Sequence, residues 1–124
     1  MFTHAIVRTP APTLAEGLTS AQLGKPDYAL ALRQPAAYVA ALQACSVAVT
    51  VLDADPAYPE SCFVEATAVL AERLAVITRL GALSRQGEEA RVAETLRQFY
   101  PPVQIEALLP PGTLEGGDVM RVED

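Results

Sequence analysis

The stretch YPESCFVEATAVLAERLAVITR, residues 58–79, decides the fold of this chain. Residues 62–70 and 74–79 are two short runs rich in apolar side chains, and the charged pair Glu72-Arg73 separates them. This pattern predicts two strands of a β-hairpin that turns near Glu72. The other elements of the fold are therefore assigned by their position before or after this hairpin.

After the hairpin, the pattern changes from strand to helix and back. Residues 88–99 (EEARVAETLRQF) carry apolar side chains on one helical face, namely Val92, Leu96 and Phe99. Pro101-Pro102 then ends this predicted helix. Residues 103–108 (VQIEAL) predict a strand, and residues 119–122 (VMRV) predict the start of a last one.

Before the hairpin, a helix is expected to begin at Pro26-Asp27, because proline suits a first helical position and an acid there favours the helix dipole. The face expected to be apolar is formed by Tyr28, Leu32, Val39 and Leu42. Pro35 lies on the same face. An interior proline costs about 3 kcal/mol, so Pro35 is expected to kink the helix or split it in two.

Two strands flank this helix. Residues 2–8 (FTHAIVR) predict a first strand, residues 47–52 (VAVTVL) predict a buried strand, and residues 10–25 form a long loop. The helix–strand–strand grouping thus occurs about twice, after a first strand. We expect an α/β protein with small mixed sheets, as a single domain over residues 1–124.

Composition excludes several classes of function. The chain has 124 residues, 51% of them hydrophobic, and a formal net charge of −6, which argues against a nucleic-acid partner. No apolar stretch approaches the roughly 20 residues that cross a bilayer, and no signal peptide is expected, so we expect a cytoplasmic protein without a membrane partner. With His4 as the single histidine, no metal site and no cofactor are expected.

Three segments could bind a ligand. In residues 58–66, Glu60 and Glu65 flank Phe63, and carboxylates beside an aromatic ring suit a planar cation such as guanidinium. The alternative is that these acids are simply solvated. In residues 78–88, Arg79 and Arg85 bracket a loop, where an arginine either clamps a carboxylate or only solubilises the surface.

The third segment is PGTLEGGDV, residues 111–119, in which a glycine pair lies between Glu115 and Asp118. It permits a close approach of the backbone, or it is a plain turn. A nucleophile is harder to find. Cys45 ends an Ala-rich helix, and Cys62 adjoins acids that disfavour a thiolate. Both cysteines are expected to be unpaired thiols.

Six motifs, taken together and in order, carry a family resemblance. They are FTHAIVRTP, LGKPDYALAL, YPESCFVEATAV, AVITR, SRQGEEARVAETLRQFY and PGTLEGGDVM. The chain resembles dimethylarginine dimethylaminohydrolase, of the pentein or amidinotransferase-like superfamily, over essentially its whole length. The resemblance implies part of a five-bladed α/β propeller about twice as long. It also implies metal-free hydrolysis of methylated arginine to citrulline and methylamine.

The resemblance also implies roles for single residues. Phe63 and Glu65 match the guanidinium-binding segment, and Glu60 stands where the family has aspartate. Arg85 matches the arginine that grips the substrate carboxylate, and Glu115 matches the carboxylate that supports the catalytic histidine. The loop around Leu18 matches the mobile lid over the substrate.

Departures from the family limit what this chain is expected to do alone. Ala66 replaces a guanidinium-binding aspartate, and Leu80 stands where proline is usual. The family's catalytic cysteine and histidine lie in a C-terminal half that this sequence does not contain, and neither Cys45 nor Cys62 matches the nucleophile. The chain alone is therefore expected to release no citrulline from dimethylarginine.

Three interpretations stay open. The chain is an inert N-terminal half of an enzyme, or a self-associating protein that binds arginine-like ligands without chemistry, or one half of a two-chain enzyme completed by a separate C-terminal half. The second predicts a homo-oligomer, because about half of a propeller leaves apolar faces and strand edges uncovered.

Overall fold

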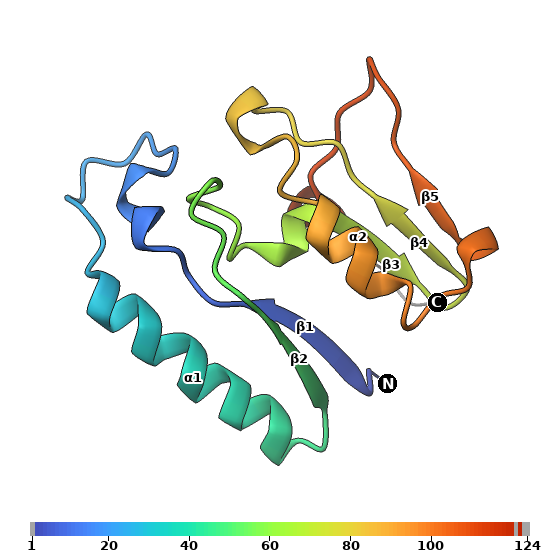
Figure 1. Cartoon of the computed structure of the whole chain (residues 1–124), viewed down its shortest axis with the longest axis horizontal. Helices are drawn as coiled ribbons and strands as arrows, with labels where there is room; N and C mark the ends of the chain where they lie inside the picture. Colours follow the sequence, from blue (N-terminus) through green and yellow to red (C-terminus); the bar gives the residue numbers. More distant parts are fainter. Residues whose placement is uncertain (1, 121, 123–124) are drawn as a thin grey trace. The chain divides into compact units, whose positions relative to one another are not determined.

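The computed structural model describes residues 2–120 and 122, and the chain divides into two compact units (Figure 1). The first unit is Met1–Cys62 and the second is Phe63–Asp124. The boundary falls inside the segment that the sequence singles out for guanidinium binding, between Cys62 and Phe63. That the chain forms a single domain stays a prediction.

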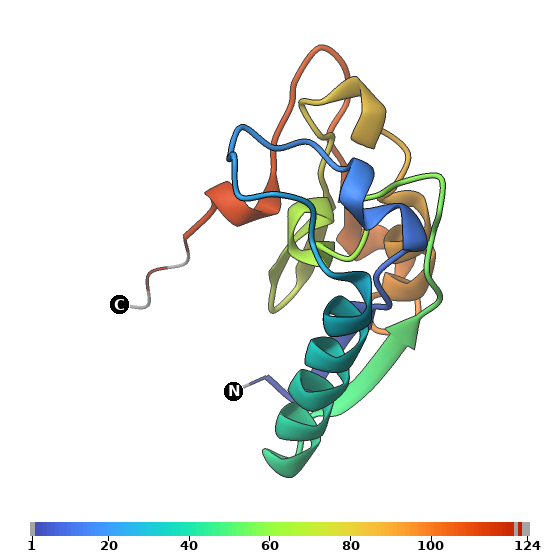
Figure 2. The ribbon, with the colours of Figure 1, turned by 90° about the vertical axis from the view of Figure 1, so that its left-hand side faces the viewer.

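The first unit is a β–α–β motif. Strand β1 (His4–Arg8) and strand β2 (Ala48–Leu52) pair in parallel, with His4 opposite Ala48 and Arg8 opposite Leu52. Helix α1 (Tyr28–Ala44) makes the crossover that a parallel pair requires. It runs along one face of the pair, as two views of the ribbon show (Figures 1 and 2). Both predicted strands and the predicted helix are confirmed.

The N-terminus of α1 lies where the sequence places it. Asp27 is the N-cap, and its carboxylate accepts a hydrogen bond from the Leu30 N–H at 3.0 Å. The expected split at Pro35 is wrong, because one unbroken helix runs through this proline. A proline cannot donate to the carbonyl four residues earlier, which is that of Ala31. The bonds and caps on either side of Pro35 outweigh this local loss.

The C-terminus of α1 has a Schellman motif. The Val47 N–H donates to the Leu42 carbonyl at 3.1 Å, and the Ser46 N–H donates to the Gln43 carbonyl at 2.9 Å. Ser46 has a φ of 63°, the left-handed conformation that usually selects glycine at this position. The chain thus reverses sharply from α1 into β2 through a residue other than glycine.

Little of the first unit's sheet or helix is buried. No residue of α1 is buried, and the Leu32 side chain of the expected inner face is 39% exposed. The prediction that residues 47–52 form a buried strand is wrong in part, since Leu52 is buried but Val51 is 54% exposed. Successive side chains of a strand point to opposite faces, and α1 covers only one face of the pair.

The second unit contains a mixed three-stranded sheet. Its strands are β3 (Ala68–Ala71), β4 (Leu74–Ile77) and β5 (Ile105–Ala107), in the spatial order β3-β4-β5. The first pair is antiparallel and the second is parallel, with helix α2 (Ala90–Leu96) in the crossover. The predicted hairpin, its turn at Glu72-Arg73 and the α/β class with small mixed sheets are confirmed.

Four expected elements of the second unit differ in the structure, and one of them is the strand expected over 103–108, which is shortened to β5 because Pro102–Gln104 form a 3₁₀ turn. Residues 62–67 are not strand, because Val64–Thr67 form a 3₁₀ turn, in which the Thr67 hydroxyl donates to the Val64 carbonyl at 2.7 Å. The predicted helix over 88–99 is shorter at both ends. No strand begins at Val119 or Met120, and Arg121 of that predicted strand lies outside the described residues.

A compact core holds the second unit together. Its buried apolar side chains come from the turn before β3, from β4, from the following loop and from α2, and they are Ala66, Ala75, Ile77, Leu80, Val92 and Leu96. The sequence predicted the inward face of α2 correctly at its two central positions, whereas Phe99 is 37% exposed. Among the described residues, no helix is long and apolar enough to cross a membrane.

Candidate functional site

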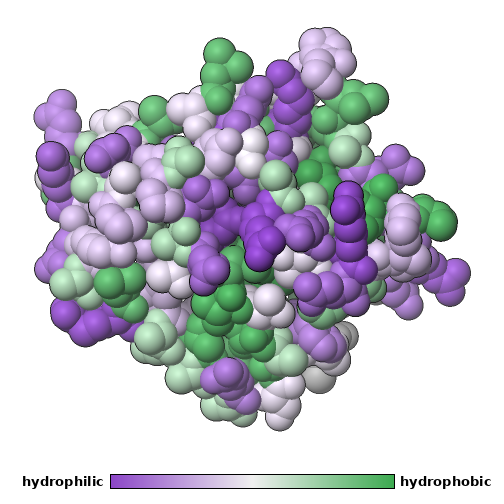
Figure 3. Space-filling model, viewed as in Figure 1, coloured by the Kyte–Doolittle hydropathy of each residue, from purple (hydrophilic) through white to green (hydrophobic). Residues whose placement is uncertain are grey.

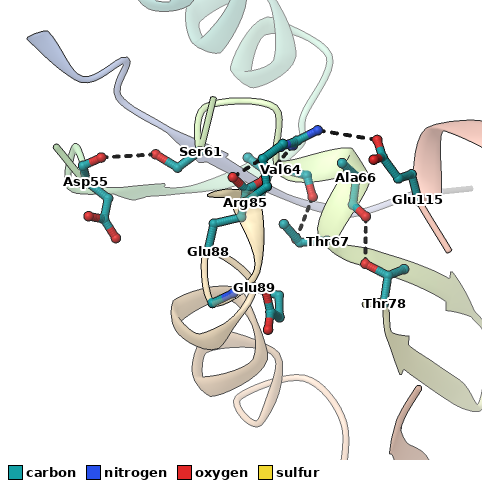
Figure 4. Close-up of polar contacts among 11 residues, drawn as sticks. Asp55, Ser61, Val64, Ala66, Thr67, Thr78, Arg85, Glu88, Glu89 and Glu115 are labelled. Atoms are coloured by element: carbon teal, nitrogen blue, oxygen red, sulfur yellow. Dashed lines mark hydrogen bonds and ion pairs between the residues drawn. The ribbon is translucent and has the colours of Figure 1, made fainter. Parts of the chain in front are cut away.

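A buried arginine between two glutamates is the main polar feature of the second unit (Figure 4). Arg85 lies on a 3₁₀ turn, Leu83–Arg85, and only 9% of it is exposed. Its Nε and Nη2 donate to the Glu88 carboxylate at 3.3 and 2.5 Å, and its Nη1 donates to the Glu115 carboxylate at 3.3 Å. We call these three residues the Arg85 cluster.

The local sequence SRQGE explains why Glu88 reaches Arg85. Gly87 has a φ of 110°, a conformation that other residues rarely adopt, and it turns the chain back on itself. The Glu88 N–H then donates to the Arg85 carbonyl at 3.2 Å. The turn brings the carboxylate against the guanidinium in a two-pronged pair, the strongest geometry for these groups.

Glu115 reaches the cluster from a distant segment. It precedes a 3₁₀ turn, Gly116–Asp118, and its side chain is 37% exposed. Gly116 is buried against the turn that carries Glu65. A Cβ on Gly116 would overlap the Glu65 carbonyl oxygen and would lie 2.8 Å from the Ala68 carbonyl oxygen. Glycine is therefore required at 116 for Glu65 and Glu115 to lie on adjacent turns.

The predicted guanidinium-binding residues of this unit are accessible. Phe63 is 57% exposed and Glu65 is exposed; Glu65 lies on the 3₁₀ turn before β3 and Phe63 is the N-cap of that turn, so neither is at the start of a strand. Ala66, where an aspartate was expected, is buried, and its carbonyl accepts the Thr78 hydroxyl at 2.7 Å (Figure 4). The turn is thus held to the residue that follows β4, while Glu65 on the same turn is exposed.

The remaining two predicted site residues lie together in the first unit. Leu18 is 60% exposed and follows a 3₁₀ turn, Pro12–Glu16, in the long loop. The preceding Gly17 packs on Glu60, since a Cβ on Gly17 would lie 2.9 Å from the Glu60 Cγ. The structure therefore brings the expected lid loop and one expected carboxylate side by side within this unit.

Arg79, the other arginine that the sequence singled out, has a structural role. Its Nη1 donates to the Gly112 carbonyl and its Nη2 to the Gln86 side-chain oxygen, both at 3.3 Å. It also pairs through its backbone with Leu114 in an isolated bridge. Arg79 therefore ties two loops of the second unit together.

Sequence reasoning missed Glu88, the most buried member of the cluster, at 1% exposure. A signal existed, because Glu88 follows Arg85 at the i, i+3 spacing and a glycine lies between them. The close packing of Gly116 on Glu65 had no local signal, since it joins segments that are distant in sequence. Among the described residues, no group of three or more His, Cys, Asp or Glu side chains could hold a metal.

The Arg85 cluster has one positive and two negative charges, so it has a net charge of −1 when both carboxylates are ionised. Glu65 is exposed on the turn whose backbone packs against Gly116, the residue that follows Glu115. Carboxylates that face outward can pair with an organic cation, and a guanidinium fixed in a fork geometry can pair with a carboxylate. The arrangement thus suits a ligand that bears both groups.

Comparison with known proteins agrees with this geometry. No family model matches the chain. The N(G),N(G)-dimethylarginine dimethylaminohydrolase of Pseudomonas aeruginosa is 52% identical over 124 residues, which are 100% of this chain and 48% of that protein. The protein of the same name from Streptomyces coelicolor is 44% identical over 123 residues, which are 97% of this chain and 46% of that protein. The chain thus spans about half the length of these relatives.

Solved structures give the same result. Dimethylarginine dimethylaminohydrolase as an adduct with S-methyl-L-thiocitrulline superposes with a TM-score of 0.95 at 52% identity, over 98% of this chain and 48% of that one. A mutant of the Pseudomonas aeruginosa enzyme complexed with citrulline has a TM-score of 0.94 over the same shares. The N-terminal domain of ArgZ, an arginine dihydrolase from cyanobacteria, shares the fold at 15% identity, with a TM-score of 0.76 over 94% of this chain and 43% of that one.

The fold is therefore the N-terminal part of the pentein fold. Within that superfamily, the chain is a homologue of the N-terminal half of the dimethylarginine dimethylaminohydrolases.

Gly116→Ala tests the close packing that positions Glu115 beside Glu65. The added methyl group must displace two backbone carbonyls, so we expect a loss of about 1–3 kcal/mol in the free energy of unfolding. Gly117→Ala is the matched control, because no atom lies within 4 Å of a Cβ there. Urea unfolding followed by circular dichroism measures both. Equal stability of the two variants would contradict the packing described.

Proposed function

We propose that this chain forms the guanidine-binding half of a hydrolase that converts N-methylated arginine to citrulline and methylamine. By itself it binds arginine-like ligands and does not turn them over. The observation that carries the proposal is the Arg85 cluster, a fixed guanidinium with Glu65 on the adjacent turn, in a chain 52% identical to a dimethylarginine dimethylaminohydrolase. Solved relatives contain citrulline or a thiocitrulline adduct, which supports a ligand of this class.

Each site residue has a proposed role in ligand binding. Glu65 pairs with the ligand guanidinium while Phe63, which is 57% exposed, stacks on its plane. Arg85 pairs with the ligand carboxylate, and Glu60 and Leu18 contribute a further carboxylate and a lid. Glu115 supports a histidine from the second half. Ala66 cannot donate or accept through its side chain, so the guanidinium has one carboxylate fewer than in the family.

We propose that this chain alone does not turn over dimethylarginine, because of the groups that it has. Cys45 is the C-cap residue of α1. His4 lies at the start of β1, with its Nδ1 2.9 Å from the Thr3 hydroxyl. Neither residue matches the family's nucleophile or base, which we propose are supplied by a C-terminal half. Cys45 and Cys62 form no disulfide with each other, as suits the proposed cytoplasmic location.

Self-association is a second candidate, and α1 favours it. Arg33 is the single charged residue of this 17-residue helix, a composition typical of a helix covered on all sides. In the structure no residue of α1 is buried, and Leu30 and Tyr38 are 42% and 60% exposed. Apolar side chains are visible at the surface around α1 and the β1–β2 pair (Figure 3). We propose that a second copy, or a complementary C-terminal half, covers them.

Ligand binding is tested by isothermal titration calorimetry with L-arginine. We expect the purified chain to bind L-arginine and Glu65→Gln to bind it about tenfold more weakly, because a charge-assisted hydrogen bond is lost. The matched control is Glu72→Gln, which removes an exposed acid in the hairpin turn of the same unit. Equal affinities of the two variants, or no heat of binding for the unmodified chain, would contradict the proposal.

The same preparation incubated with dimethylarginine is expected to release no citrulline above background. Turnover that disappears in Cys62→Ser would show that the chain alone builds a nucleophile site, and the half-enzyme proposal would then be wrong.

Self-association is tested by analytical ultracentrifugation at micromolar concentrations. We expect a dimer or larger species for the unmodified chain and a monomer for the double variant Leu30→Glu/Tyr38→Glu, because two carboxylates would have to be buried in the interface. Thr19→Glu, in the exposed loop of the same unit, is the control and should leave the mass unchanged. A monomeric unmodified chain would rule out this second candidate.

A further inference from the structure

The first unit lacks a strand that the second unit has. In the second unit, β4 and β5 are parallel strands with α2 in the crossover, and β3 pairs antiparallel with the other edge of β4. The first unit repeats this arrangement with β1, α1 and β2. Within the part of the chain that the structure describes, however, β1 pairs with β2 alone. The edge of β1 that corresponds to the covered edge of β4 is therefore not paired with another strand.

Hydrogen bonds around β1 show which of its backbone groups lie on this edge. The Ala48 N–H donates to the Thr3 carbonyl at 2.9 Å, and the Thr9 N–H donates to the Leu52 carbonyl at 3.0 Å. Because successive residues of a strand turn their backbone groups to alternate edges, the odd-numbered residues from Thr3 to Thr9 face β2. The N–H and carbonyl of Ile6, in the middle of β1, point away from β2. An edge of this kind is a template for pairing with another strand.

A second copy of the chain can supply that strand through its own β1. The strand that pairs with β4 is antiparallel, and antiparallel pairing of β1 with β1 of a second copy is compatible with a two-fold axis perpendicular to the sheet. With the axis at Ile6, the Ile6 N–H of each copy donates to the Ile6 carbonyl of the other. Parallel pairing of the two edges would give the two copies different bonds, so it would not close a symmetric dimer.

The same two-fold axis brings the two α1 helices together. Because the axis is perpendicular to the sheet, both helices lie on the same face of a four-stranded sheet in the order β2-β1-β1-β2. Neighbouring strands are about 4.8 Å apart, so the midlines of the two β1–β2 pairs are about 9.6 Å apart. Packed helices have a similar spacing, roughly 8–10 Å. Since α1 runs along one face of its own pair (Figures 1 and 2), it would lie directly beside its copy.

The surface of α1 suits this position. Arg33 is the one charged residue of the helix, and no residue of α1 is buried. A groove of about 220 Å³ remains between α1 and its strands, and much of its lining is apolar, from Val7, Leu32, Pro35 and Val39. The strands of the first unit therefore leave an apolar helix largely uncovered, and a neighbouring copy of α1 would cover part of it.

We propose that two copies of this chain join edge to edge through β1, in an antiparallel pairing centred on Ile6, with their α1 helices side by side on one face of the joined sheet. The β1 strand of the second copy then takes the place that β3 has beside β4. This inference rests on the second candidate of the proposed function, self-association, and adds the surface and the geometry through which it occurs.

Hydrogen exchange of single amides, followed by NMR on the unmodified chain at concentrations where ultracentrifugation shows the dimer, tests this pairing. The N–H groups of Ile6 and Val51 both point outward, at opposite edges of the β1–β2 pair. We expect the Ile6 amide to exchange about tenfold more slowly than the Val51 amide, after correction for intrinsic rates, because only Ile6 is bonded across the interface. In the double variant Leu30→Glu/Tyr38→Glu, the two rates should be equal.

Ile6→Pro and Val51→Pro are a matched pair of variants for the same interface. Proline is tolerated where the N–H of an edge strand points outward, and it blocks pairing at that edge. We expect Ile6→Pro to raise the dimer dissociation constant about tenfold, because the two Ile6 hydrogen bonds are lost, and Val51→Pro to leave it unchanged. Analytical ultracentrifugation measures both constants, and circular dichroism checks that both variants fold.

The outcomes separate the edge pairing from self-association in general. A dimer in which Ile6 exchanges as fast as Val51, or in which Ile6→Pro associates as tightly as Val51→Pro, would overturn the pairing and leave self-association through another surface. An unmodified chain that stays monomeric would overturn both and would favour a strand of a complementary C-terminal half at this edge. The exchange measurement uses the unmodified chain, so it decides the question even if neither proline variant folds.

Discussion

The second unit depends on the buried pair between Arg85 and Glu88. A guanidinium that is nine-tenths buried cannot remain without a counter-ion, and Glu88, with no exposed side-chain surface, supplies it at two nitrogens. The remaining nitrogen is thereby aimed at the segment that carries Glu115. The turn at Gly87 lets Arg85 and Glu88 pair within one short segment. The packing of Gly116 on the Glu65 carbonyl, by contrast, joins two segments that are distant in sequence.

The two units share an architecture but differ in how much they bury. Each contains two parallel strands connected through a helix, and the second adds an antiparallel strand before them. The second unit has a core of six apolar side chains among its described residues, while in the first unit no residue of the helix is buried. A unit with so little burial gains little from the hydrophobic effect, so we infer that the first unit needs a partner more than the second does.

Local chemistry made much of this fold predictable from sequence. Asp27, which is followed by apolar side chains at helical spacing, marks the start of α1. Glu72-Arg73, between two apolar runs, marks the hairpin turn. Where the prediction from sequence failed, contacts between segments that are distant in sequence determined the local structure. Residues 62–67 have strand-like composition, but Val64–Thr67 form a 3₁₀ turn, whose Ala66 carbonyl accepts a hydrogen bond from the Thr78 hydroxyl just after β4. Proline usually interrupts a helix, yet α1 continues through Pro35.

The candidate site was only partly predictable from the sequence, for the same reason. The resemblance picked out Phe63, Glu65, Arg85 and Glu115, and the structure brings the last three onto neighbouring turns. No residue pattern showed that Arg85 already has two carboxylate partners. That fact changes its interpretation, because the ion pairs with Glu88 and Glu115 give Arg85 a structural role within the second unit.

The most direct test of the account is the stability of Glu88→Gln by urea unfolding. Removing one partner of a buried pair should cost about 3–5 kcal/mol, and Arg85→Met/Glu88→Met, which removes both charges, should recover much of that loss. Those results would establish the pair as the constraint on which the site rests. A Glu88→Gln variant as stable as Glu72→Gln would contradict the account, because the guanidinium would then be held by something else.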